Sequence, residues 1–244
     1  MTDPWYHTFF GRDYARFDDH PDTALEVSFL RELLPEEGCS VLDMACGAAR
    51  HTAPLSRAGY RITGLDRSEA LLNRARKKKG PFNLVRGDVQ QVPLPDKSFD
   101  AIISIFSSIG YFEDETDNFH VFAEMSRVLK PGGRLIIDTV NRDFFIRHAS
   151  RQSWFEKGGL TILEERWLDL ETSRSEINVI VLEKGKRREY HHSIRLYTAA
   201  ELAMLLAAVG IDTLVVFGDF GGSELSADTH RMIVVGEKRE TPGL

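Results

Sequence analysis

Residues 41–51 read VLDMACGAARH, and this stretch decides the fold. Apolar residues lead to an acid at Asp43, small residues follow as far as Ala49, and a polar helix start comes next. A buried parallel strand passes into a helix in this way where an α/β sheet binds a nucleotide. Small side chains let the backbone approach a ligand, and free N–H groups at a helix start favour an anion. The stretch therefore predicts an α/β protein with a ligand site at this turn.

Two further acids follow apolar runs, and they distinguish a ligand site from an ordinary strand–turn–helix corner. Asp66 ends the second run, roughly 20 residues beyond the turn, where an acid commonly binds a ribose diol. Asp88 ends the third run. A single acid at a strand end is often only a helix cap. Three acids at the carboxyl ends of successive strands point to one ligand that lies across the sheet.

Five short motifs follow one another along the chain. They are LDMACG at 42–47, GLD at 64–66, GD at 87–88, FD at 99–100 and LKPGG at 129–133. As a set, they resemble the class I S-adenosylmethionine-dependent methyltransferases over about residues 33–141 and the closing strands. The resemblance implies an α/β, Rossmann-like sheet of seven strands, mostly parallel with an antiparallel last strand, and helices on both faces. One departure is the turn, where Gly47 stands alone and family members usually have two or three glycines.

A single methyltransferase domain is expected over residues 1–244, and its parts are assigned as follows. An N-terminal helical lid takes 1–35, the cofactor-binding core takes 36–141 and 198–240, and an antiparallel β insertion takes 142–197. Alternating and β-branched residues predict three strands in the insertion, at 160–170, 175–183 and 189–197. The insertion is expected to cover the substrate or to contact a second copy.

The core elements follow from periodicity and caps. Helices are expected at 22–34, from 47 to about 58, after Ser68, at 119–129 and at 198–209, the last opened by the capping box TAAE. The first of these helices is expected to turn Leu25, Phe29 and Leu33 inward. Strands are expected at 60–66, 83–87, 101–106, 134–140, 211–217 and 232–236. The last two are joined by a turn and so must be antiparallel.

Each part of S-adenosylmethionine then has expected partners. Its carboxylate suits the helix start and Arg50, and its ribose suits Asp66. Its adenine suits Asp88 and the N–H of Val89. Asp43 either balances the ammonium group or organises the turn. The full set of expected cofactor-binding residues is Asp43, Ala45, Gly47, Arg50, Asp66, Arg67, Asp88, Val89, Ser104 and Ile105.

Methyl transfer is a direct displacement, so alignment of the groups matters most, and a base is needed only if the acceptor arrives protonated. His51 is the first candidate base and Tyr111 the second; the alternatives are a helix-start residue and a packed loop aromatic. Tyr111 lies in SSIGYF at 107–112, which is similar to small-molecule N-methyltransferases, including amino-sugar dimethyltransferases. The expected substrate residues are Tyr6, Tyr14, Tyr111, Trp154 and Arg195. The acceptor atom, nitrogen or oxygen, stays open.

Composition limits the partners. The net charge is −6 with scattered basic residues, which argues against a nucleic-acid binder. Cys39 and Cys46 lack metal-ligand spacing, and no metal site is expected. No stretch resembles a membrane span or a signal peptide, so we expect a cytoplasmic monomer or homodimer that acts on a small-molecule acceptor.

Two alternatives remain. A nicotinamide-dependent oxidoreductase would also use the glycine turn and Asp66, but the G-x-G-x-x-G fingerprint is absent, and Asp88 would have no role. A non-catalytic S-adenosylmethionine-binding interaction module would be indicated by loss of the acids, and all three acids are present.

Overall fold

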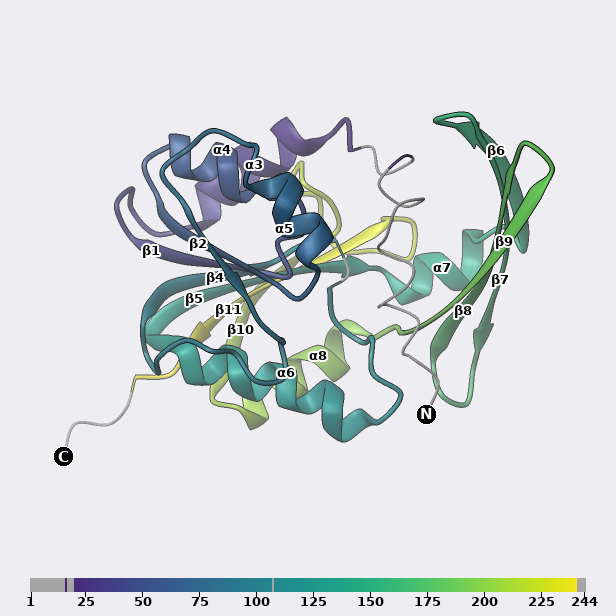
Figure 1. Cartoon of the computed structure of the whole chain (residues 1–244). Coiled ribbons are helices and arrows are strands. Elements are labelled where there is room, and N and C mark those ends of the chain that lie inside the picture. Colours follow the sequence, from purple (N-terminus) through teal and green to yellow (C-terminus); the bar gives the residue numbers. More distant parts are fainter. Residues whose placement is uncertain (1–15, 17–19, 107, 241–244) are drawn as a thin grey trace.

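The computed structural model describes residues 16, 20–106 and 108–240. Most of the expected N-terminal lid, with Tyr6 and Tyr14, lies outside the described residues. Two β-sheets and the helices around the larger sheet make up the described part (Figure 1).

The larger sheet has seven strands in the order β10-β11-β5-β4-β1-β2-β3. The strands are β1 (Ser40–Met44), β2 (Arg61–Asp66), β3 (Asn83–Arg86), β4 (Phe99–Ser104), β5 (Leu129–Val140), β10 (Ile211–Phe217) and β11 (Arg231–Lys238). The pairs among β1 to β5 are parallel, and β11 runs antiparallel to both β5 and β10. The predicted seven-stranded sheet with an antiparallel closing strand is confirmed.

Helices cover both faces of this sheet, as Figure 1 shows. The bounds are α3 (Thr23–Leu33), α4 (Thr52–Arg57) and α5 (Glu69–Ala75) on one side, and α6 (Glu115–Val128) and α8 (Ala199–Ala208) on the other. Neighbouring residues of β1 pack on opposite faces of the sheet. Val41 lies in the same cluster as Phe29 of α3, whereas Leu42 lies in the cluster that holds Phe122 of α6. A parallel sheet buried on both faces explains why β1 is a continuous apolar run.

The smaller sheet is antiparallel and lies beside the core, next to α7 (Arg142–His148) in Figure 1. Its order is β6 (Gln152–Lys157), β7 (Leu160–Asp169), β8 (Arg174–Glu183) and β9 (Lys186–Arg195). The prediction of three strands was incomplete, because β6 is a fourth. Its sequence QSWFEK is mostly polar and only half-buried at alternate positions, as is usual for an edge strand.

Several predicted boundaries move: β5 begins at Leu129 and not at residue 134, and three others shift as follows. The α6 helix begins at Glu115 because Asp114 accepts a hydrogen bond from the Thr116 N–H at its start. The β4 strand ends at Ser104, before Phe106 takes a left-handed backbone conformation with φ of 68°. The α4 helix begins only at Thr52. None of the described helices is both long enough and apolar enough to cross a membrane.

Candidate functional site

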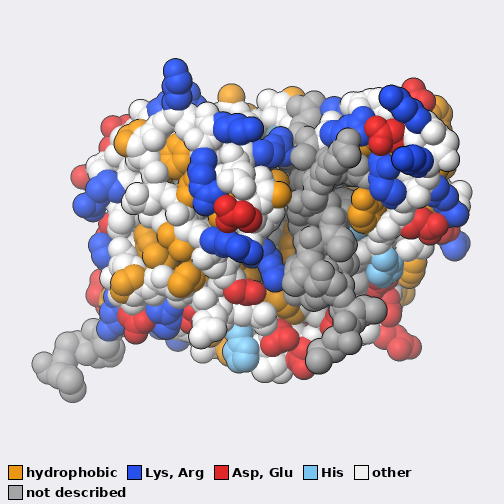
Figure 2. Space-filling model, in the orientation of Figure 1, with side chains coloured by type: hydrophobic (Ala, Val, Ile, Leu, Met, Phe, Trp, Pro, Cys, Tyr) orange, Lys and Arg blue, Asp and Glu red, His pale blue; other side chains and the backbone are white. Residues whose placement is uncertain are grey.

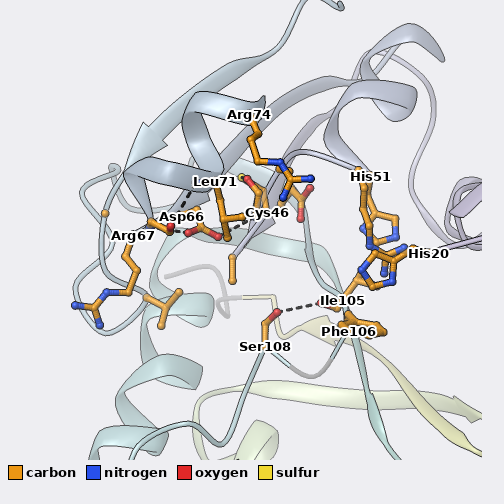
Figure 3. Close-up of a pocket in the computed structure, with 18 of the residues that line it drawn as sticks. His20, Cys46, His51, Asp66, Arg67, Leu71, Arg74, Ile105, Phe106 and Ser108 are labelled. Carbon is orange, nitrogen blue, oxygen red and sulfur yellow. Dashed lines mark hydrogen bonds between the residues drawn. The ribbon is translucent and has the colours of Figure 1, made fainter. Parts of the chain in front are cut away.

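A cavity of about 570 Å³ opens at the carboxyl ends of β1, β2 and β4, beside α5 (Figure 3). Its volume is in the range of small-molecule sites. It is lined by eleven of the sequence-predicted site residues: Asp43, Ala45, Gly47, Arg50, His51, Asp66, Arg67, Asp88, Val89, Ile105 and Tyr111. The structure thus brings the three acids from successive strand ends to one ligand-sized space.

The turn after β1 is left-handed at three positions. Ala45, Gly47 and Ala49 have φ values of 62°, 54° and 59°. A Cβ on Gly47 would meet only Leu71, at 3.9 Å, so backbone conformation and not crowding favours glycine there. The two alanines adopt the same region at a cost in strain, which is typical of ligand-binding turns. Because of this turn, α4 starts at Thr52 and not at the predicted position near Ala48.

Asp66 holds the turn in place. Its Oδ2 accepts a hydrogen bond from the Gly47 N–H at 2.8 Å, and its Oδ1 accepts one from the Ser68 N–H at 2.8 Å. The side chain is 8% exposed, and its burial raises the pKa of the carboxyl group. Each carboxylate oxygen has a second lone pair, so Asp66 retains the capacity to accept hydrogen bonds from a ligand.

The other two acids differ in their surroundings. Asp43 is buried, which raises its pKa, and its Oδ2 accepts a hydrogen bond from the Thr52 hydroxyl. Asp43 therefore organises the connection between β1 and α4. Asp88 is partly exposed in the cavity lining. Its Oδ1 accepts a hydrogen bond from the Gln90 N–H at 3.0 Å, and Arg67 lies 3.8 Å away.

Glu26 is a site residue that the sequence analysis missed. It lies on α3, is 7% exposed, and accepts hydrogen bonds from Arg50 and from His51 Nε2, the latter at 2.7 Å. The inner face of α3 was predicted only in part. Phe29 is buried and Leu33 packs against the core as expected, but Leu25 is 54% exposed, and Glu26 and Leu30 are buried. An acid on the inner face gives no apolar signal, so hydrophobic spacing alone did not reveal it.

Phe106 is a second missed residue. Its N–H donates to Asp138 Oδ2 at 2.8 Å, which holds the left-handed backbone that follows β4. Its ring lies 5.3 Å from the guanidinium carbons of both Arg50 and Arg231, and it meets the His20 ring edge-on at 4.6 Å. Figure 3 shows His51, His20 and Phe106 together at one end of the cavity. A bulky residue in this conformation is strained, as is common at functional sites.

Basic side chains form part of the wall on the α5 side, namely Arg67, Arg74, Lys77 and Lys78. Figure 2 shows a group of Lys and Arg side chains on the face in view. The sequence analysis described the basic residues as scattered, so this grouping is a correction. It arises because Arg67 precedes α5, Arg74 lies on it, and Lys77 and Lys78 follow it.

Tyr111 is half-buried in the cavity wall. Burial, with a smaller contribution from the Asp66 charge, raises the pKa of its phenol. The hydroxyl therefore stays protonated near neutral pH. In that state, Tyr111 is suited to donating a hydrogen bond and not to removing a proton.

Three predicted site residues lie outside the cavity lining. Ser104 is fully buried within β4, and Trp154 is 70% exposed on β6. Arg195 pairs with Glu115 at 3.2 Å and with Glu201 at 2.5 Å. These partners occupy Arg195 in joining β9 to α6 and α8. Within the described part of the chain, no group of three His, Cys, Asp or Glu side chains is arranged to hold a metal.

Residues 42–137 match the family model for a methyltransferase domain. The chain therefore contains a methyltransferase domain. The methyltransferase is 28% identical to the putative methyltransferase YqeM of Bacillus subtilis, over 95% of this chain and 97% of that protein. It is 26% identical to the dTDP-3-amino-3,4,6-trideoxy-alpha-D-glucopyranose N,N-dimethyltransferase of Streptomyces venezuelae, over 82% and 84% of the two chains.

A solved structure extends the likeness to the fold. The S-adenosylmethionine-dependent methyltransferase of Clostridium acetobutylicum superposes with a TM-score of 0.76 at 19% identity, over 96% of this chain and 99% of that chain. At 19% identity this likeness shows the fold, and the match to a methyltransferase domain supports S-adenosylmethionine as the methyl donor. These relatives do not favour an oxidoreductase or a non-catalytic binding module.

Proposed function

We propose that this methyltransferase acts on the amino group of a small molecule, and that its acceptor is an amino sugar. The observation that carries the proposal is a single cavity on which three strand-end carboxylates and the left-handed turn converge. One relative is named for N,N-dimethylation of a nucleotide-linked amino sugar, and the match to this chain covers 84% of that relative's length. The name of this relative supports a nucleotide-linked amino sugar as the class of acceptor.

The residues fit S-adenosylmethionine part by part. Asp66 uses its remaining lone pairs for the ribose hydroxyls, while its bonds to Gly47 and Ser68 keep the carboxylate in place. Asp88 and Val89 line the cavity after β3, where adenine is proposed to bind.

The N–H groups of the turn and Arg50 take the carboxylate of the cofactor. Because α4 is a short helix that starts at Thr52, the left-handed turn and not a helix terminus supplies these donors.

The chain contributes mainly alignment to the reaction. S-adenosylmethionine supplies a methyl group on a sulfonium, which is a good leaving group. Ile105, Phe106 and Tyr111 line the part of the cavity that follows β4. Their packing fixes where an acceptor nitrogen sits, and alignment of this kind contributes several powers of ten to a rate. Tyr111 donates a hydrogen bond that orients the acceptor.

We assign the smaller sheet to the acceptor side of the site. The loop after β4 is tied to that sheet: the Arg195 N–H donates to the Gly110 carbonyl at 2.8 Å, and Arg174 Nη1 donates to the Phe112 carbonyl at 2.9 Å. Gly110 packs so closely on the Arg195 carbonyl that a Cβ there would clash. These contacts support a role for the sheet in shaping the acceptor pocket.

The cellular setting is part of the proposal. Cys39 and Cys46 are both free thiols, which suits a reducing compartment such as the cytoplasm. The net charge of −6 supports a small-molecule acceptor over nucleic acid. We assign the working form to a monomer or a homodimer.

The test is a methylation assay with S-adenosylmethionine and dTDP-3-amino-3,4,6-trideoxyglucose, with the matching 3-hydroxy sugar as control. We expect S-adenosylhomocysteine release with the amine alone, and mass spectrometry should place the new methyl group on nitrogen. Release of S-adenosylhomocysteine with the hydroxy sugar alone would overturn the proposal. So would the absence of release with the amino sugar and with every primary amine of a broader panel.

A further inference from the structure

A carboxylate–imidazole pair adjoins the cavity end that holds Phe106: His51 lines the cavity, and Glu26 contacts His51. Glu26 of α3 accepts a hydrogen bond from His51 Nε2 at 2.7 Å, and both side chains are buried. His51 lines the cavity and follows directly after the turn that binds the cofactor. His51 therefore lies with Phe106 and His20 at one end of the cavity.

The charge of Glu26 fixes which nitrogen of His51 carries a proton. Burial raises the pKa of Glu26, but the hydrogen bond from His51 and the Arg50 charge outweigh it and lower the value to about 2. Glu26 is then an acceptor only, so His51 Nε2 must carry a hydrogen. The neutral ring leaves its lone pair on Nδ1, which makes no hydrogen bond to any described residue.

We propose that His51 Nδ1 removes the proton from the ammonium group of the acceptor, and that Glu26 is the positioning residue that fixes the tautomer and orientation of His51. This inference rests on the proposed function, because only an amine acceptor arrives as an ammonium ion.

The steps balance as follows. The N–H bond of the ammonium breaks and its proton moves to Nδ1, which leaves a neutral amine with a free lone pair. That lone pair forms the new N–C bond while the C–S bond breaks, and the sulfonium becomes a neutral thioether. The product ammonium and the protonated imidazole then release protons to solvent. Glu26 stays ionised throughout and stabilises the imidazolium ion.

The charges around His51 are consistent with this role. Glu26 on α3 and Asp43 on β1 are the acids that face it, Arg50 precedes it in the chain, and His20 lies on the same side of the cavity. Behind Phe106, Arg231 forms an ion pair with the fully buried Asp138, so that pair is internally neutral. The ionised Glu26 is the charged group that contacts the His51 ring directly.

The test compares kcat from pH 6 to about 9.5 for wild type, His51→Gln and Glu26→Gln, with dTDP-3-amino-3,4,6-trideoxyglucose as acceptor. We expect His51→Gln to lower kcat about a hundredfold or more at pH 7, and Glu26→Gln about tenfold. Both losses should shrink as the pH nears the pKa of a free amine, about 10, because the acceptor then arrives neutral.

The matched control is Glu124→Gln on α6. Glu124 accepts a hydrogen bond from the Val92 N–H at 2.7 Å and pairs with Arg127, away from the cavity, so its kcat profile should follow wild type. Calorimetric affinity for S-adenosylhomocysteine should change less than about threefold in His51→Gln. This binding measurement needs no acceptor and reports directly on folding of the variants.

The outcomes separate the inference from the proposed function. If wild type methylates the amine and His51→Gln loses the same factor at every pH, or loses nothing, His51 is structural and the inference is overturned. If His51→Gln recovers at high pH but Glu26→Gln matches wild type at pH 7, the role of Glu26 is overturned. If wild type methylates no amine, the proposed function fails, and the inference fails with it.

Discussion

At the scale of single residues, the site depends on side chains that serve the fold and the ligand together. Asp66 receives N–H donors from Gly47 and from Ser68, and its own oxygens remain available to a ribose. Because the same carboxylate shapes the turn and contacts the cofactor, its loss has two consequences. Tyr111 lines the same cavity from the loop after β4.

Replacing Asp66 with Asn should weaken binding of S-adenosylhomocysteine about 10- to 100-fold. The Asn amide keeps one acceptor oxygen, but it turns its NH₂ group toward one of the backbone N–H groups that Asp66 accepts from. Losing a hydrogen bond to a charged group costs about 1.5–3 kcal/mol. Isothermal calorimetry measures the change. The matched control is Asp169→Asn, because Asp169 also accepts two backbone N–H bonds, from Glu171 and Thr172, in an exposed turn. Unchanged affinity in Asp66→Asn would refute the ribose assignment.

Replacing Tyr111 with Phe should leave cofactor affinity unchanged and lower kcat about tenfold, because one oriented hydrogen bond to the acceptor is lost. Steady-state kinetics with the amino sugar and calorimetry with S-adenosylhomocysteine give the two numbers. Tyr60→Phe, in the core beneath α3, serves as the control. A large loss of cofactor affinity in Tyr111→Phe would instead assign Tyr111 to the cofactor pocket.

At the scale of elements, regular patterns made the sheet predictable, and local chemistry moved the boundaries. Successive residues of β1 pack into the cores on opposite faces of the sheet, which explains why an apolar run predicted this strand. The predicted capping box of α8 is present with both of its hydrogen bonds. The late start of α4 was not predictable, because alanine rarely adopts a positive φ and Ala49 does so here. The polar edge strand β6 was missed for a different reason. It buries few apolar side chains, so its sequence gives little hydrophobic signal.

Replacing Thr198 with Ala should lower stability by about 1 kcal/mol, which for a chain of this size lowers Tm by about 2–4 °C. The Thr198 hydroxyl accepts from the Glu201 N–H at 3.2 Å, and Glu201 Oε2 accepts from the Thr198 N–H at 2.7 Å. Thr198→Ser keeps the hydroxyl and should retain the wild-type Tm. Equal melting of all three proteins by differential scanning calorimetry would show that the cap contributes nothing.

At the scale of the molecule, the convergence of the three acids was predictable, because parallel strands end at one edge. The partners of those acids were not. Glu26 meets His51 across 25 positions of sequence, and Phe106 lies between arginines from two distant parts of the chain. Such contacts depend on how α3 and β11 pack, and no local pattern encodes them.

Glu26 also links stability to acid. Its pKa falls from 4.5 to about 2 on folding, so its stabilisation is complete above pH 4.5 and is lost as the pH falls toward 2. Between pH 6 and pH 3, this one group should account for about 2 kcal/mol of lost stability. Urea denaturation at the two pH values should show a correspondingly smaller loss for Glu26→Gln than for wild type. Equal losses in the two proteins would contradict the lowered pKa.

The most direct measurement of the whole account is a crystal structure of the wild-type protein with S-adenosylhomocysteine. We predict the ribose hydroxyls within hydrogen-bond distance of Asp66, the adenine beside Asp88, and the sulfur facing the end of the cavity formed by His51 and Phe106. A nucleoside bound away from Asp66, or a sulfur directed toward α5, would contradict the account.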